Sequence, residues 1–80
     1  MAFDRTLDKE LSSKEVLADG STRLTIAIYQ YNGGIPKVQI KREVQNPGDD
    51  DWKFAKLGRL TFEELQAVAD GLMWAKETMP

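Results

Sequence analysis

The sequence contains no cysteine and no histidine. Without cysteine the chain can form neither disulfides nor thiolate metal sites. Without histidine it lacks the commonest general base and the commonest nitrogen ligand of metals. We therefore expect a protein that is not an enzyme, with no metal, no cofactor and no small-molecule substrate.

Long apolar runs are also missing. No segment approaches the roughly 20 apolar residues that a membrane-spanning helix requires, and the N-terminal residues MAFDRTLDKE lack the apolar core of a signal peptide. The sequence therefore predicts no membrane association and a cytoplasmic location.

The chain is short but has the composition of a folded protein. Its 80 residues are 41% hydrophobic and 30% charged, which predicts one soluble domain over residues 1–80. The net charge is −2, yet residues 22–60 carry seven basic and four acidic residues, a balance of +3. The remainder, with four basic and nine acidic residues, is −5. The distribution predicts a basic sheet with an acidic periphery.

The first third of the chain has a weak pattern. Residues 1–6 are expected to form a loose terminus. Leu7 to Ala18 has apolar residues compatible with a helix, but it lacks an obvious cap, and we favour a strand near Ser12 to Leu17. Asp19-Gly20 is a strong signal for a tight hairpin turn.

Two segments show the alternation of half-buried strands. In Thr22 to Tyr31, Leu24, Ile26 and Ile28 alternate with Thr25, Ala27, Tyr29 and Tyr31. From Lys37 onward, Val38, Ile40 and Val44 alternate with Lys37, Gln39, Lys41 and Glu43. The turn Asn46 to Asp49 then leads to a further strand-like run, Trp52 to Leu60. Residues 12–60 are thus predicted to form a four-stranded antiparallel meander.

A helix is predicted over residues 62–77. Thr61 and Glu64 have the spacing of a capping box, in which each side chain satisfies the other residue's backbone N–H. Apolar residues recur with helical spacing, and Trp74 lies beside this stripe. The expected fold class is α+β, a four-stranded antiparallel meander followed by one C-terminal helix.

Basic and aromatic residues gather in the predicted sheet. Such a surface can bind single strands, because cations contact phosphates and rings stack on bases. The alternative is an ordinary solvated sheet face. The candidate nucleic-acid-binding residues are Tyr29, Tyr31, Lys37, Lys41, Arg42, Trp52, Lys53, Lys56 and Arg59.

Residues 22–72 resemble the transcriptional positive cofactor four family of single-stranded-DNA-binding proteins. The resemblance rests on K-V-Q-I-K, on the following N-P-G turn with its acidic residues, and on K-L-G-R-L-T-F-E-E-L. It implies a meander-plus-helix homodimer that binds single-stranded DNA, or alternatively RNA. It also implies that Lys41 and Lys56 contact the nucleic-acid backbone. The family has a stacking aromatic residue where this sequence has Val44.

The predicted function is therefore that of a single-stranded-DNA-binding, transcription-cofactor-like protein. The helix is expected to supply the dimer interface, through Leu65, Val68, Leu72 and Trp74. The alternative is a protein-interaction or regulatory module on the same scaffold without nucleic-acid binding, which the pI of about 5.0 and the missing ring at Val44 favour.

Overall fold

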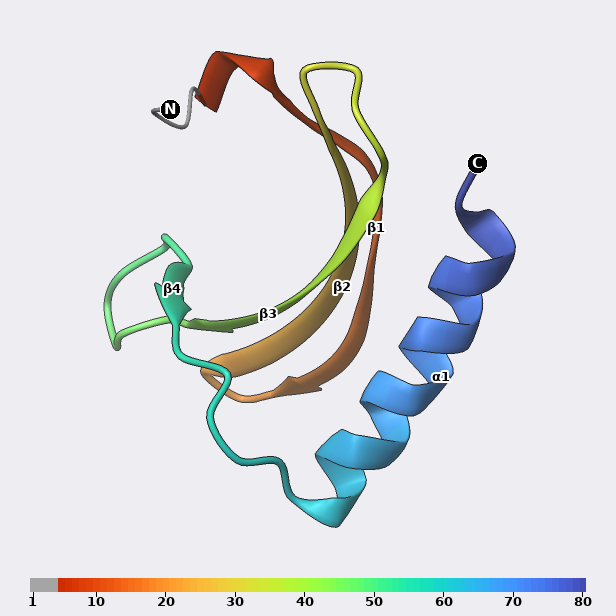
Figure 1. Ribbon diagram of the computed structural model, residues 1–80. Helices are drawn as coiled ribbons and strands as arrows, with labels where there is room; N and C mark the ends of the chain where they lie inside the picture. Colours follow the sequence, from red (N-terminus) through yellow and green to blue (C-terminus); the bar gives the residue numbers. More distant parts are fainter. Residues whose placement is uncertain (1–4) are drawn as a thin grey trace.

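The computed structural model describes residues 5–80 and has one sheet and one long helix (Figure 1). A 3-10 helix, Arg5–Leu7, precedes strand β1 (Asp8–Asp19). Strands β2 (Thr22–Tyr31), β3 (Lys37–Val44) and β4 (Lys53–Ala55) follow, and the chain ends with α1 (Phe62–Thr78). Of the predicted loose terminus, residues 1–4 lie outside the described residues, and the rest begins the 3-10 helix.

The sheet is the predicted antiparallel meander, with the strands side by side in the order β1-β2-β3-β4. The structure confirms the preferred strand in the first third of the chain, but β1 is longer than residues 12–17. It pairs along the whole of β2, and two irregularities, between Glu10 and Ser12 and between Glu15 and Leu17, interrupt its register. These bulges break the alternation of apolar residues, which is why the sequence pattern was weak there.

The fourth strand is much shorter than the predicted run from Trp52 to Leu60. Only Lys53–Ala55 pairs with β3. Gly58 has a φ of +60°, which ends any extended conformation at that point. Arg42 then fixes the following segment, because its Nε donates a 3.0 Å hydrogen bond to the Leu57 carbonyl. The second half of the predicted strand is therefore a connection to α1.

Helix α1 begins as predicted. The Thr61 hydroxyl accepts a 3.1 Å hydrogen bond from the Glu64 backbone N–H, and the Glu64 carboxylate accepts one of 2.9 Å from the Thr61 N–H. This confirms the capping box. Two backbone donors of the first turn thereby gain partners that the helix itself cannot supply.

The core lies between one face of the sheet and α1. Its fully buried members include Leu24, Ile26 and Ile28 of β2, packed with Val68 and Ala75 of the helix. Gly71 is buried at the same contact, where an added Cβ would lie only 2.5 Å from Ile26 Cγ1. Small residues therefore let the helix approach the sheet closely. No helix within residues 5–80 is long and apolar enough to cross a membrane.

Curvature distinguishes the two faces of the sheet. Helix α1 covers the convex face, and the concave face opens away from it (Figure 1). Thr25 and Ala27 alternate with the core residues of β2, which places them on the concave face. Ala27 is nevertheless 0% exposed, so the bending of the sheet closes its centre. The concave face is a trough whose centre, at Ala27, is closed to solvent.

Candidate nucleic-acid interface

The register of β2 and β3 places most of the predicted aromatic and basic residues on the concave face. Directly paired residues of antiparallel strands share a face, and Tyr29 pairs with Lys37 while Thr25 pairs with Lys41. Tyr31 follows Tyr29 by two positions and lies on the same face. Four of the nine candidates, Tyr29, Tyr31, Lys37 and Lys41, are thus brought together by strand alternation.

One polar cluster occupies the middle of this face. Lys41 Nζ donates a 2.9 Å hydrogen bond to the Tyr29 hydroxyl and lies 5.5 Å from the centroid of its ring. The Glu10 carboxylate of β1 is 3.8 Å from the same Nζ. Burial lowers the pKa of Lys41, but the Tyr29 hydrogen bond and the neighbouring Glu10 and Glu43 carboxylates outweigh it, so the pKa is raised. Lys41 therefore keeps its charge and holds the Tyr29 ring.

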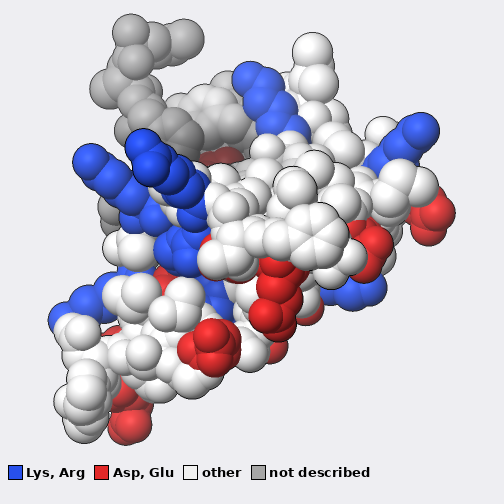
Figure 2. All heavy atoms as spheres, turned by 90° about the horizontal axis from the view of Figure 1, so that it is seen from below, with Lys and Arg blue, Asp and Glu red and all other residues white. Residues whose placement is uncertain are grey.

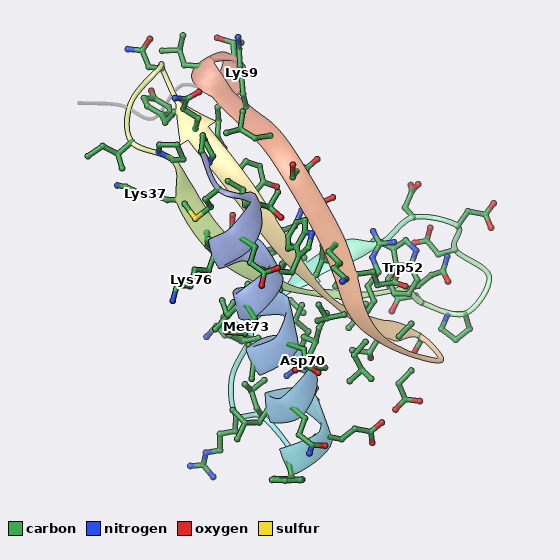
Figure 3. All side chains as sticks on the ribbon, turned by 90° about the vertical axis from the view of Figure 1, so that its right-hand side faces the viewer. Lys9, Lys37, Trp52, Asp70, Met73 and Lys76 are labelled. Atoms are coloured by element: carbon green, nitrogen blue, oxygen red, sulfur yellow. The ribbon has the colours of Figure 1, made fainter. Side chains whose placement is uncertain are left out.

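A second cluster lies toward the other end of the trough. The Arg23 guanidinium carbon is 4.4 Å from the centroid of the Trp52 ring, a cation–π contact, and Arg23 Nε donates a 3.0 Å hydrogen bond to Glu43. Figure 3 shows Trp52 and Lys37 toward opposite ends of the sheet. Arg23 and Tyr29 are six residues apart on β2, about 20 Å at roughly 3.3 Å per residue, and Lys41 and Glu43 lie in one polar recess with Arg23.

The remaining predicted cations lie elsewhere. Arg42 alternates onto the face that carries α1 and forms a 2.7 Å ion pair with Glu64. It is thus bound to the helix start and does not reach the trough. Lys53 is exposed and lies 3.4 Å from Asp49 in the preceding turn. Lys56 and Arg59 are exposed in the segment between β4 and α1.

Three contributors were absent from the predicted binding residues. Arg23 belongs to the trough, and its place in the alternation with Thr25 and Ala27 was the signal that could have identified it. Ile35, in the β2–β3 connection, is 81% exposed. No periodic pattern marks that position, because it lies outside any strand. Phe54 of β4 pairs with Glu43 and is 69% exposed, which adds a third ring near the Trp52 cluster.

Acidic residues moderate the positive charge of the trough. Glu10, Glu15 and Glu43 share a polar recess with Arg23 and Lys41. In Figure 2 most of the visible Lys and Arg side chains gather on the left, the side to which the concave face opens, and Asp and Glu are scattered around them. The polar recess of the concave face therefore carries charges of both signs. Within residues 5–80, no group of three or more carboxylates is arranged to hold a metal ion.

The predicted dimer residues fall on different sides of α1. Val68 is buried against the sheet and Trp74 is half-buried against the core, so neither can provide much surface to a partner. Leu65 and Leu72 are exposed. Phe62 and Met73 are exposed with them, and helical spacing places all four along one stripe. Four large apolar side chains of α1 thus point outward, while Gly71 and Ala75 occupy the closest contact with the sheet.

Comparison with known proteins assigns no relatives to this chain. No protein-family model, no curated protein and no solved structure matches it. Any assignment of function therefore rests on the chemistry of the surface described above.

Proposed function

We propose that this protein binds single-stranded nucleic acid, DNA in the first instance, in the concave trough of its sheet. One observation carries the proposal: aromatic rings and cations from three elements share a curved face that no other described element covers. A curved face of this kind accommodates a flexible strand, whereas a rigid duplex would reach only its rim.

Rings and cations contact different parts of the strand: rings stack on bases, and cations contact phosphates. Tyr29 and Trp52 are each held by a neighbouring cation, so their positions are set before a ligand arrives. Stacking of a base on such a ring is worth roughly 1–3 kcal/mol. Lys37, exposed on this face, supplies charge for a phosphate, and each neutralised phosphate releases a counterion. Affinity should therefore fall as salt rises.

Titration of fluorescent oligo-dT at two salt concentrations tests the proposal. We expect binding at low salt that weakens at high salt. Lys37→Glu should weaken binding, because Lys37 is exposed at one end of the trough. Lys14→Glu is the matched control: it makes the same charge change, but Lys14 pairs with Ile26 and so lies on the convex side. Absence of binding at low salt, or equal effects of the two variants, would contradict the proposal.

We further propose that the protein is a homodimer formed through the exposed stripe of α1. The stripe consists of Phe62, Leu65, Leu72 and Met73. Its members are apolar from Phe62 to Met73, about three turns of the helix, so two copies related by a two-fold axis can bury these side chains against each other. The fully buried core of one copy is small, and a second copy would enlarge it.

The resemblance of residues 22–72 to the positive cofactor four family also supports a transcription-cofactor-like role for a cytoplasmic protein. A protein-interaction module remains the second candidate, and the same exposed stripe favours it. The two differ in their predictions: a module of that kind would be monomeric alone and would not bind oligo-dT at low salt.

A further inference from the structure

A cavity of about 560 Å³ lies at the β2–β3 end of the trough. This is within the range of 300–1,000 Å³ that is usual for small-ligand sites. Its walls include side chains from the starts or ends of three strands and from the connection between two of them: Asp8, Tyr29, Tyr31, Ile35, Lys37 and Gln39. The Lys41 cluster borders it through Tyr29.

The connection that closes this cavity is held in a defined shape. Asn32 and Gly33 have φ values of +49° and +70°, and the Gly34 N–H donates a 2.8 Å hydrogen bond to the Tyr31 carbonyl. The Gln30 side chain donates a further bond of 2.9 Å to the Gly34 carbonyl. The Asn32 N–H donates to the carbonyl of Leu7, which ties the connection to the start of β1. A ligand therefore meets a site that is already formed, which lowers the entropy cost of binding.

The exposure of Ile35 has no explanation in the fold. It is the most exposed of the large apolar residues in residues 5–80, and it lies beside two tyrosine rings in the wall of the cavity. An aliphatic side chain and aromatic rings in one cavity wall offer apolar surface to a flat ring. Lys37 at the same site supplies a cation, while Asp8 and Gln39 supply acceptor and donor atoms.

We propose that this cavity receives one unpaired nucleobase of the bound strand. Ile35 and the tyrosines contact its faces, the polar side chains face its edge, and Lys37 contacts the adjoining phosphate. Each base has a ring face for stacking and N–H or carbonyl groups at its edge, so the chemistry fits nucleobases as a class. The inference rests on the proposed function and adds a base-specific contact to backbone binding.

The test compares oligo-dT with an abasic oligonucleotide of the same length, which keeps the phosphates and lacks the bases. Ile35→Ser should weaken binding of oligo-dT by about tenfold, the scale of one lost stacking contact. It should leave binding of the abasic strand unchanged. Since Ile35 is 81% exposed, the variant should unfold at the same temperature as the parent protein. Leu11→Ser, another exposed apolar position but on β1, is the matched control and should alter neither affinity.

A second measurement reports on the site directly. Stacking of a base beside Ile35 should shift its side-chain methyl resonance by ring current when oligo-dT is added, and the abasic strand should produce no such shift. Suppose that oligo-dT binds, but that Ile35→Ser binds it as tightly as the parent and the Ile35 methyl resonance of the parent does not shift. The base pocket is then refuted while the proposed function stands. If Ile35→Ser weakens both strands equally, the pocket is likewise refuted. If neither strand binds, both proposals fall.

Discussion

The guanidinium of Arg23 lies 4.4 Å from the Trp52 ring centroid and at the same time donates a 3.0 Å hydrogen bond to Glu43. Lys41 is placed in the same manner between Tyr29 and Glu10. Arg23 and Lys41 thus each have a ring on one side and a carboxylate on the other. A phosphate approaching either cation must compete with a carboxylate of the same sheet.

This competition predicts a variant that binds more tightly than the parent. Glu43→Gln leaves Arg23 without its anionic partner, so Arg23 becomes free to pair with a phosphate. We expect the affinity for oligo-dT to rise roughly threefold to fivefold at low salt, the effect of about 1 kcal/mol from one close charge in water. Glu77→Gln, on the exposed side of α1, makes the same change in net charge and should have a smaller effect. Equal gains from both would show that only the net charge matters.

The Arg42–Glu64 ion pair predicts a dependence of stability on acid pH. The hydrogen bond from Arg42, followed by that from the Thr61 backbone, lowers the pKa of Glu64. Its contribution to stability is therefore present above the unfolded pKa of about 4.3 and is lost as the pH falls through the lower folded value. Thermal unfolding should show Glu64→Gln less stable than the parent at pH 7, with the difference shrinking as the pH falls below the unfolded pKa.

Glu63→Gln is the control for that experiment. Glu63 lies in the same first turn, is exposed and takes no part in the Arg42–Glu64 ion pair. A difference between Glu64→Gln and the parent that persists unchanged at pH 3 would contradict the role given to the Arg42 ion pair.

We predict that replacing Gly71 by alanine destabilises the protein, the reverse of the usual effect at a glycine in a helix. Alanine normally stabilises a helix interior by about 1 kcal/mol relative to glycine. Here the added Cβ would lie 2.5 Å from Ile26 Cγ1 and 2.6 Å from Val16 Cγ1, and overpacking costs about 1–3 kcal/mol. Gly71→Ala should therefore lower the free energy of unfolding in urea, whereas Asp70→Ala, at an exposed neighbouring position, should not.

The exposed stripe of α1 predicts a change in oligomeric state. Leu72→Asp places a charge in the middle of the proposed two-fold contact, where burial would leave it unpaired. Sedimentation should show the parent protein as a dimer and the variant as a monomer at the same concentration. Thr78→Asp, which introduces the same charge at an exposed position on the opposite side of the helix, should remain dimeric. A monomeric parent protein would refute the dimer.

The sequence alone determined those features that depend on near neighbours in the chain. Alternation in Thr22–Tyr31 and from Lys37 assigned each side chain of β2 and β3 to its face, because successive residues of a strand point to opposite sides. Thr61 and Glu64 marked the helix start, because a capping box is closed within four residues. The four-stranded meander followed from these elements and the short turns between them.

Only the tertiary structure decided which neighbours each side chain contacts. Arg42 and Lys41 are adjacent basic residues, yet one is bound to Glu64 and the other to Tyr29, because the strand sends them to opposite faces and α1 covers only one. Gly71 lies close to Ile26, while four large apolar residues of α1 point outward. The curvature of the sheet and the cavity beside Ile35 depend on contacts between distant segments, which no local pattern records.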